Sequence, residues 1–238
     1  MDNQIIHITM QEADVYAVDY FIRICGFNRS GAKYEKLLKI GMEIKERIKD
    51  RIDIKAIVSS FDRDIIHENT AGMNDTVFVC NAFEQIPKDS IQKIYAYILT
   101  AGVYELEDTD PILEQLYANI WGTAYVDAGL EVLKNKLRRD LAEDTPVSAN
   151  VLDSFGPGYY GMDVDQVGNF FQILDGDRIG VKVRNNCLML PLKSCSGFFI
   201  AVDDETKLPN SDCKSCRADH KGCEFCQAKI KRKQPIFT

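Results

Sequence analysis

The first hundred residues alternate between two patterns of apolar positions. Thr9 and Glu12 have the spacing of a capping box, and apolar residues then recur every three or four positions as far as Gly26, which predicts a helix. The same spacing predicts helices over residues 34–48 and 90–101. Apolar residues at every second position predict strands over residues 4–8, 52–58 and 76–83.

A long helix is predicted in the middle of the chain. Asp110 suits the N-cap and Pro111 the first helical position, and the apolar pattern continues to Leu141, with a break expected near Gly122. Asp127 falls within about 20° of the apolar stripe of this helix on a 100°-per-residue wheel. A carboxylate there must be hydrated, paired or bound to a ligand. Asp127 is therefore a candidate site residue, the alternative being an ordinary acid on the flank of a helix.

A Gly-Pro-Gly turn opens the most distinctive stretch of the sequence. It consists of Gly156, Pro157 and Gly158, and Tyr159 and Tyr160 follow at once. Proline restricts one φ angle, and each glycine can adopt a positive φ or allow another backbone to approach closely. Such a turn beside two tyrosines is either a ledge for a small molecule or a tight loop without a ligand.

The residues after this turn predict one helix and two strands. Asp163 and Gln166 have the spacing of a capping pair for a helix over residues 164–174. Two apolar runs rich in β-forming residues predict strands over residues 179–183 and 195–202. The turn is therefore expected to be backed by a helix and a hairpin.

The composition excludes several classes of function. The 238 residues are 45% hydrophobic, enough for a sizeable core, and their net charge is −7. We expect no nucleic-acid partner, since phosphate binding needs a concentrated basic face. The N-terminal residues lack the features of a signal peptide, and no stretch has the roughly eighteen apolar residues of a membrane span. We therefore expect a cytoplasmic protein that does not enter a membrane.

Cysteines provide the most specific chemical signal, in residues 205–238. Two CxxC pairs separated by six residues contain Cys213, Cys216, Cys223 and Cys226. Such pairs can direct four thiolates at one centre, as tetrahedral zinc or a four-iron four-sulfur cluster requires. We predict a metal-binding tail with zinc or such a cluster, and the alternative is two reduced CxxC pairs without metal.

Several motifs resemble the activation domain of cobalamin-dependent methionine synthase, and more closely its stand-alone version. The signature of that domain is Arg-x-x-Pro-Gly-Tyr, then a helix, a Gly-Val strand and a Pro-x-x-Ser-x-Ser-Gly segment. The matching positions here are Pro157, Gly158, Tyr159, Gly180, Val181, Pro191, Ser194, Ser196 and Gly197. Ser154 stands where the signature has arginine, and serine cannot replace the two parallel hydrogen bonds of a guanidinium to a carboxylate.

The resemblance implies an α+β fold over residues 1–204, with helices packed around a curved, mainly antiparallel sheet. The polar, turn-rich residues after Val202 separate this domain from the cysteine-rich tail, which we assign to residues 205–238. The resemblance also implies that S-adenosylmethionine lies against the turn of Gly156, Pro157, Gly158 and Tyr159. An acidic residue of the long helix would hold the amino end of the ligand; this is Asp127, or in its place Glu131. A corrinoid-carrying partner would face Tyr160, Lys193, Ser194, Ser196 and Gly197.

These implications define the predicted function. In cobalamin-dependent methyl transfer, oxidation of cob(I)alamin leaves an inactive cob(II) form, and rescue needs one electron and a methyl group from S-adenosylmethionine. Since no corrinoid-binding module is recognisable, the chain is expected to act in trans on a corrinoid-binding methyltransferase of the methionine synthase type. Two alternatives remain open: an iron–sulfur protein that reduces a corrinoid protein, and a zinc-stapled docking module without catalysis.

Overall fold

A five-stranded antiparallel sheet organises the chain. The computed structural model describes residues 2–103, 110–144, 149–185, 187–203 and 206. The strands lie in the order β1-β2-β6-β10-β7, and every neighbouring pair is antiparallel. Their bounds are β1 (Gln4–Ile8), β2 (Ile54–Phe61), β6 (Ile91–Thr100), β7 (Ala149–Val151) and β10 (Ser194–Asp203). The longest strands, β6 and β10, pair with each other in the interior of the sheet.

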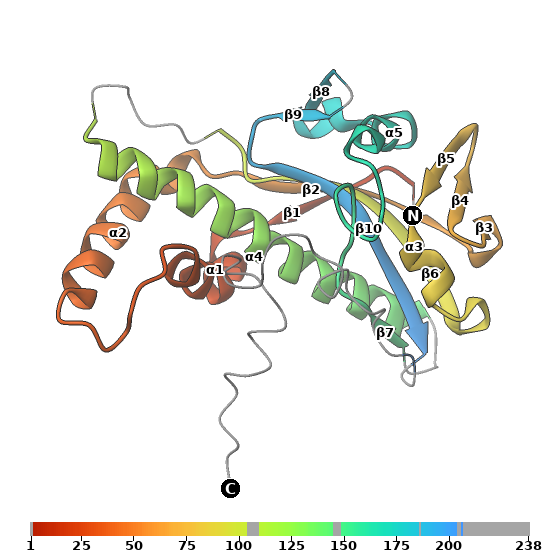
Figure 1. The fold of residues 1–238 in the computed structure, drawn as a ribbon, viewed down its shortest axis with the longest axis horizontal. Coiled ribbons are helices and arrows are strands. Elements are labelled where there is room, and N and C mark those ends of the chain that lie inside the picture. The colour runs from red at the N-terminus through yellow and green to blue at the C-terminus, as the bar shows by residue number, and fades with distance from the viewer. Residues whose placement is uncertain (1, 104–109, 145–148, 186, 204–205, 207–238) are drawn as a thin grey trace, which may run out of the picture.

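Three helices cover one face of the sheet: α1 (Met10–Ile24), α2 (Tyr34–Ile48) and α4 (Ile112–Asp144). Figure 1 shows α4 running across the molecule beside α1 and α2. Trp121 of α4 joins the three helices, because its ring stacks on Phe21 of α1 at 4.0 Å and its Nε1–H donates to the Gly41 carbonyl of α2 at 2.7 Å. Trp121 therefore connects α4 to both α1 and α2.

A second layer covers the opposite face. It contains a small sheet of β3 (Ile66–His67), β4 (Thr70–Met73) and β5 (Thr76–Val79), the helices α3 (Asn81–Gln85) and α5 (Val167–Ile173), and the hairpin of β8 (Lys182–Arg184) and β9 (Leu188–Leu190). Aromatic rings of Phe78, Phe170 and Phe198 pack together between this layer and β10. The sheet is therefore buried on both faces, and β10 contributes alternate residues to the two cores.

Several sequence predictions are confirmed. The capping box at the start of α1 forms in full: the Thr9 N–H donates to the Glu12 carboxylate at 2.8 Å, and the Glu12 N–H donates to Thr9 Oγ1 at 3.2 Å. The helix over residues 34–48 and the strand over 4–8 are present at those bounds. The α+β class and the curved antiparallel sheet are also as predicted.

The helix predicted over residues 90–101 is wrong, because this segment is the strand β6. Ile91, Ile94, Tyr95 and Ile98 fit helical spacing, but a strand buried on both faces also has an almost continuous apolar sequence. Tyr95, Tyr97 and Leu99 face the α4 side, and Ile94, Ala96 and Ile98 face the other. The β-branched residues of the segment were the signal that favoured a strand.

Other local predictions need correction. The strand expected over residues 76–83 ends at Val79 and gives way to α3, and the expected strand over 179–183 is a short 3-10 helix (Gly176–Ile179) followed by β8. No break occurs at Gly122, where α4 is continuous. Asp163 makes no capping hydrogen bond, and Gln166 instead exchanges two hydrogen bonds with the backbone of Val79. A long-range partner thus replaced the local cap.

Except for Thr206, the predicted metal-binding tail lies outside the described residues, as do its cysteines Cys213, Cys216, Cys223 and Cys226. Both apolar cores of the described part of the chain are built from residues up to Val202. The boundary at residue 204 and the metal centre stay predictions.

Candidate functional site

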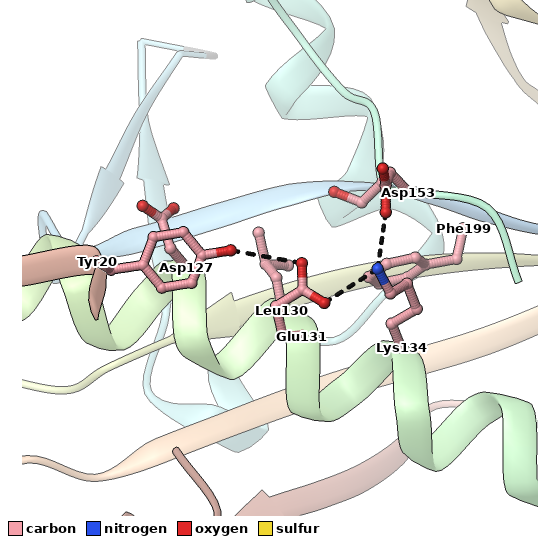
Figure 2. Close-up of a pocket in the computed structure, with 8 residues that line it drawn as sticks. Tyr20, Asp127, Leu130, Glu131, Lys134, Asp153 and Phe199 are labelled. Atoms are coloured by element: carbon pink, nitrogen blue, oxygen red, sulfur yellow. Dashed lines mark hydrogen bonds and ion pairs between the residues drawn. The ribbon is translucent and has the colours of Figure 1, made fainter. Parts of the chain in front are cut away.

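One face of α4 carries four residues that point away from the helix core toward a common cavity. Asp127, Leu130, Glu131 and Lys134 are spaced by three or four residues, which places them on one side of the helix, one above the other. Figure 2 shows Asp127, Glu131 and Lys134 following one another along α4. The amphipathic pattern of the helix thus supplies two carboxylates and one ammonium to the same place.

The cavity has a volume of about 220 Å³. Other elements close it around the α4 residues: α1 supplies Tyr20, β10 supplies Phe199, and the segment after β7 supplies Asp153 and Ser154. Leu130 and Phe199 add apolar surface to the polar groups of the lining, and this combination is typical of a small-molecule site.

A chain of polar contacts runs along one wall of the cavity. The Tyr20 hydroxyl donates to Glu131 Oε1 at 3.4 Å. The Lys134 ammonium lies 3.0 Å from Glu131 Oε2 and 2.7 Å from Asp153 Oδ1, so it bridges α4 and the segment after β7 (Figure 2). Asp127 lies next to this chain, and no dashed contact joins it to the residues drawn.

The surroundings of the cavity shift the pKa values of Asp127 and Lys134. Burial raises the pKa of Asp127 to about 6, helped by the nearby Glu131 and opposed by Arg23 and Lys193. Burial also lowers the pKa of Lys134, but hydrogen bonds to Asp153 and Glu131 outweigh it and leave that pKa raised. The described residues that line the cavity include three acidic side chains and one lysine, so the cavity favours a ligand that carries positive charge.

Ser154 is held in place by the sheet. Its Oγ lies 3.0 Å from the hydroxyl of Tyr97 on β6, and the Tyr97 ring packs on Phe199 with centroids 4.9 Å apart. Burial raises the pKa of Tyr97 well above its usual range, so the phenol stays neutral. Ser154, which stands where the signature has arginine, thus presents a hydroxyl to the cavity that is held by Tyr97.

The Gly-Pro-Gly turn begins two residues after Ser154 and packs against β10. Phe155 and Phe198 exchange two backbone hydrogen bonds of 3.1 and 2.7 Å. A Cβ at Gly156 would lie 2.4 Å from the Ser196 carbonyl oxygen, and one at Gly197 would lie 2.4 Å from the Phe155 carbonyl oxygen. Both positions therefore require glycine, because the two backbones touch there. The two motif segments, far apart in sequence, form one structural unit.

The structure places the predicted ligand-binding residues in two groups. Asp127 lines the cavity, as does its alternative Glu131. Gly156, Pro157, Gly158 and Tyr159 continue the chain beyond Ser154 without lining the cavity, and the Tyr159 side chain is 66% exposed. Their role toward a ligand stays a prediction.

The predicted partner-facing residues also differ in exposure. Ser196 and Gly197 are buried inside β10. Lys193 is partly buried and donates to Thr123 of α4 at 2.8 Å, and the Ser194 hydroxyl donates to the Pro191 carbonyl at 2.7 Å. The ring of Tyr160 packs on Phe155 at 5.8 Å. Tyr159, which precedes Tyr160 and belongs to the predicted ligand-binding set, is more exposed than any of these residues.

Sequence reasoning missed Tyr20, Lys134, Asp153 and Phe199 as cavity residues. Lys134 could have been found, since it lies seven positions after Asp127 and so shares its helix face. Asp153 could also have been considered, because it directly precedes Ser154, the position at which the signature has arginine. Tyr20 and Phe199 carry no local signal, because only the packing of α1 and β10 against α4 brings them here.

Within the described residues, no group of three or more histidine, cysteine, aspartate or glutamate side chains could hold a metal ion. None of the helices in the described part of the chain combines the length and the apolar character needed to cross a membrane.

Comparison with solved structures finds a similar fold. The chain is similar to the MetH reactivation domain whose crystal structure was solved bound to AdoHcy, with a TM-score of 0.57 and 14% sequence identity. The match covers 87% of this chain and 80% of that domain. No protein-family model matches the chain, and no curated protein matches it. The likeness confirms the fold that the sequence motifs predicted.

Proposed function

We propose that this chain binds S-adenosylmethionine in the cavity of α4 and supplies its methyl group, in trans, to a corrinoid carried by a methyltransferase partner. The observation that supports this most is the acidic cavity: three carboxylates and one ammonium lie beside the Gly-Pro-Gly segment. The fold is shared with a domain that was solved with AdoHcy.

The charge of the cavity fits this ligand class. S-adenosylmethionine carries an α-ammonium, a sulfonium and one carboxylate, so its net charge is positive. In a partly buried site, opposite charges attract more strongly than in water. Asp127 and Glu131 are the groups suited to the α-ammonium, since both lie on the cavity wall of α4.

The proposed reaction restores an inactive corrinoid. One electron from a reductase or a comparable donor converts cob(II)alamin to cob(I)alamin. The cob(I) centre then takes the methyl group from the sulfonium, which forms methylcobalamin and leaves S-adenosylhomocysteine as a neutral thioether. No side chain has to act as an acid or base. The contribution of this chain is to hold the methyl donor at the correct place, with exposed Tyr159 on the adjoining surface that meets the partner.

Ligand binding is tested by isothermal titration calorimetry with S-adenosylmethionine. We expect a single binding site. Asp127→Asn should raise the Kd of that site roughly tenfold, because a charge-assisted hydrogen bond to the ligand is lost. Asp140→Asn is the matched control, since Asp140 is an exposed acid of the same helix that does not line the cavity. Absence of binding by the wild-type chain at millimolar ligand contradicts the proposal.

The methyl transfer is tested with a corrinoid protein held in the cob(II) form. The absorbance spectrum should change to that of methylcobalamin only when this chain, S-adenosylmethionine and a one-electron reductant are all present. S-adenosylhomocysteine is the control ligand, because it lacks the methyl group. Equal rates with and without this chain contradict a role in reactivation.

A further inference from the structure

Lys134 holds a distinctive position in the cavity. Among the described residues that line it, Lys134 is the one basic side chain. Its side chain is only 14% exposed, although its ammonium contacts two carboxylates. The nearby basic residues Arg23 and Lys193 do not line the cavity: the guanidinium of Arg23 lies over the Tyr20 ring and the ammonium of Lys193 binds Thr123.

The two partners of Lys134 are held very differently. Glu131 is on the same helix, three residues away, and also accepts a hydrogen bond from Tyr20. Asp153 belongs to the segment after β7, and its side chain is 60% exposed. Water can therefore replace the lysine as the partner of Asp153 at little cost, since exposed ion pairs contribute little to stability. Asp153 is the exchangeable partner.

A ligand with an amino-acid end brings its own carboxylate into this cavity. A carboxylate removed from water needs a cation or several hydrogen-bond donors. Ser154 offers only a hydroxyl, which already lies against Tyr97, and the remaining charged groups of the cavity wall are acids. Among the described residues of this wall, Lys134 carries the one cationic group that can pair with a carboxylate.

We propose that Lys134 binds the α-carboxylate of the S-adenosyl amino acid, and that this carboxylate displaces Asp153 from the lysine. This inference rests on the proposed function and names the residue that selects the carboxylate of the ligand. Glu131 keeps the ammonium in place during the exchange, and Asp153 turns to solvent. The signature has an arginine where this chain has Ser154, and Lys134 on α4 supplies the positive charge for the carboxylate in its place.

The exchange makes two substitutions act in opposite directions. Lys134→Gln removes the charge that meets the carboxylate, so S-adenosylmethionine should bind roughly tenfold more weakly or worse. Asp153→Asn removes the competitor for the lysine, so the same ligand should bind up to about fivefold more tightly. If Lys134 served only to tie the segment after β7 to α4, both substitutions would break that tie and both would weaken binding.

The experiment measures Kd by calorimetry for two ligands, S-adenosylmethionine and its decarboxylated analogue. Wild type should prefer the ligand with the carboxylate, and Lys134→Gln should abolish that preference while changing the affinity for the analogue by less than about twofold. Lys136→Gln is the matched control: Lys136 also lies on α4 and pairs with a carboxylate, Glu12, at 2.6 Å, but outside the cavity. Lys134→Arg, which keeps the charge, should retain the preference.

The outcomes separate this inference from the proposed function. If wild type binds neither ligand, the proposed function fails, and the inference fails with it. If wild type binds S-adenosylmethionine but Lys134→Gln loses both ligands equally or neither, only the role of Lys134 is overturned. A wild-type preference for the decarboxylated analogue overturns it as well. Should Lys134→Gln fail to fold, Asp153→Asn decides the matter: tighter binding supports the exchange, and weaker or unchanged binding refutes it.

Discussion

Because the Gly-Pro-Gly turn touches β10, we expect the addition of a single methyl group at Gly156 to lower the stability of the protein strongly. Gly156→Ala adds one methyl group 2.4 Å from the Ser196 carbonyl oxygen and 3.1 Å from the Gly197 Cα, where real Cβ atoms essentially never come within 3.0 Å of another heavy atom. Both obstacles are backbone atoms of β10, which is paired along its length with β6. The strand cannot yield, so the turn must move away.

The cost can be worked out from the contacts that this movement breaks. Overpacking by one methyl group costs about 1–3 kcal/mol. Moving Phe155 away from Phe198 also stretches two backbone hydrogen bonds, each worth about 1 kcal/mol. We therefore expect Gly156→Ala to lower the free energy of unfolding by about 2–4 kcal/mol, which for a chain of this size lowers Tm by roughly 5–15 °C.

Thermal and urea unfolding followed by circular dichroism measure this loss. Gly72→Ala is the matched control, since Gly72 lies in β4 with no atom within 4 Å of an added Cβ, and its effect should stay within about 0.5 kcal/mol. Gly197→Ala places a methyl group in the same backbone contact from the side of β10. The double variant should therefore lose clearly less stability than the sum of the losses of the two single variants. A Gly156→Ala protein as stable as wild type refutes the argument that backbone contact demands glycine here.

Four further predictions concern the cavity and the tail. Burial raises the pKa of Asp127 to about 6, so its ionisation destabilises the fold: the penalty is nearly absent below about pH 4, grows between about pH 4 and 6, and is complete above that range. Asp127→Asn should therefore have a higher Tm than wild type at pH 7 and a nearly equal one at pH 4, with a difference of at most about 3 kcal/mol in the free energy of unfolding. Ser154→Arg should tighten S-adenosylmethionine binding about tenfold, measured by calorimetry, because a guanidinium meets a carboxylate with two hydrogen bonds. Deleting residues 205–238 should leave a cooperative thermal transition near that of the full chain, since the described residues up to Val202 already form two apolar cores; loss of the transition would contradict the domain boundary. Anaerobically purified protein should contain one metal centre, measured by elemental analysis. The metal content should fall sharply when any one of Cys213, Cys216, Cys223 and Cys226 is replaced by serine, but it should not fall in the control Cys187→Ser. Iron would support a redox role of this centre, and zinc would exclude it.

Local signals in the sequence were sufficient for some parts of the structure. The capping box of α1 and the start of the long helix depend on groups within a few residues of one another. The motif segments around Gly156 and Gly197 indicated the fold through resemblance, and the structure supplies the reason for those glycines. Local signals failed for residues 90–101, because burial on both faces of the sheet removed the alternation that identifies a strand.

By itself, the sequence determined the α+β class, the helix that carries Asp127 and the acidic character of the chain. Only the tertiary structure decided what surrounds Asp127. Tyr20 meets Glu131 across 111 positions of the chain, and Lys134 meets Asp153 across 19. No local pattern encodes such pairs, since they form only when α1, α4 and the segment after β7 are packed on the same face of the sheet. The charge balance of the cavity therefore depends on long-range packing, whereas the helix that bears its acids depends on local spacing.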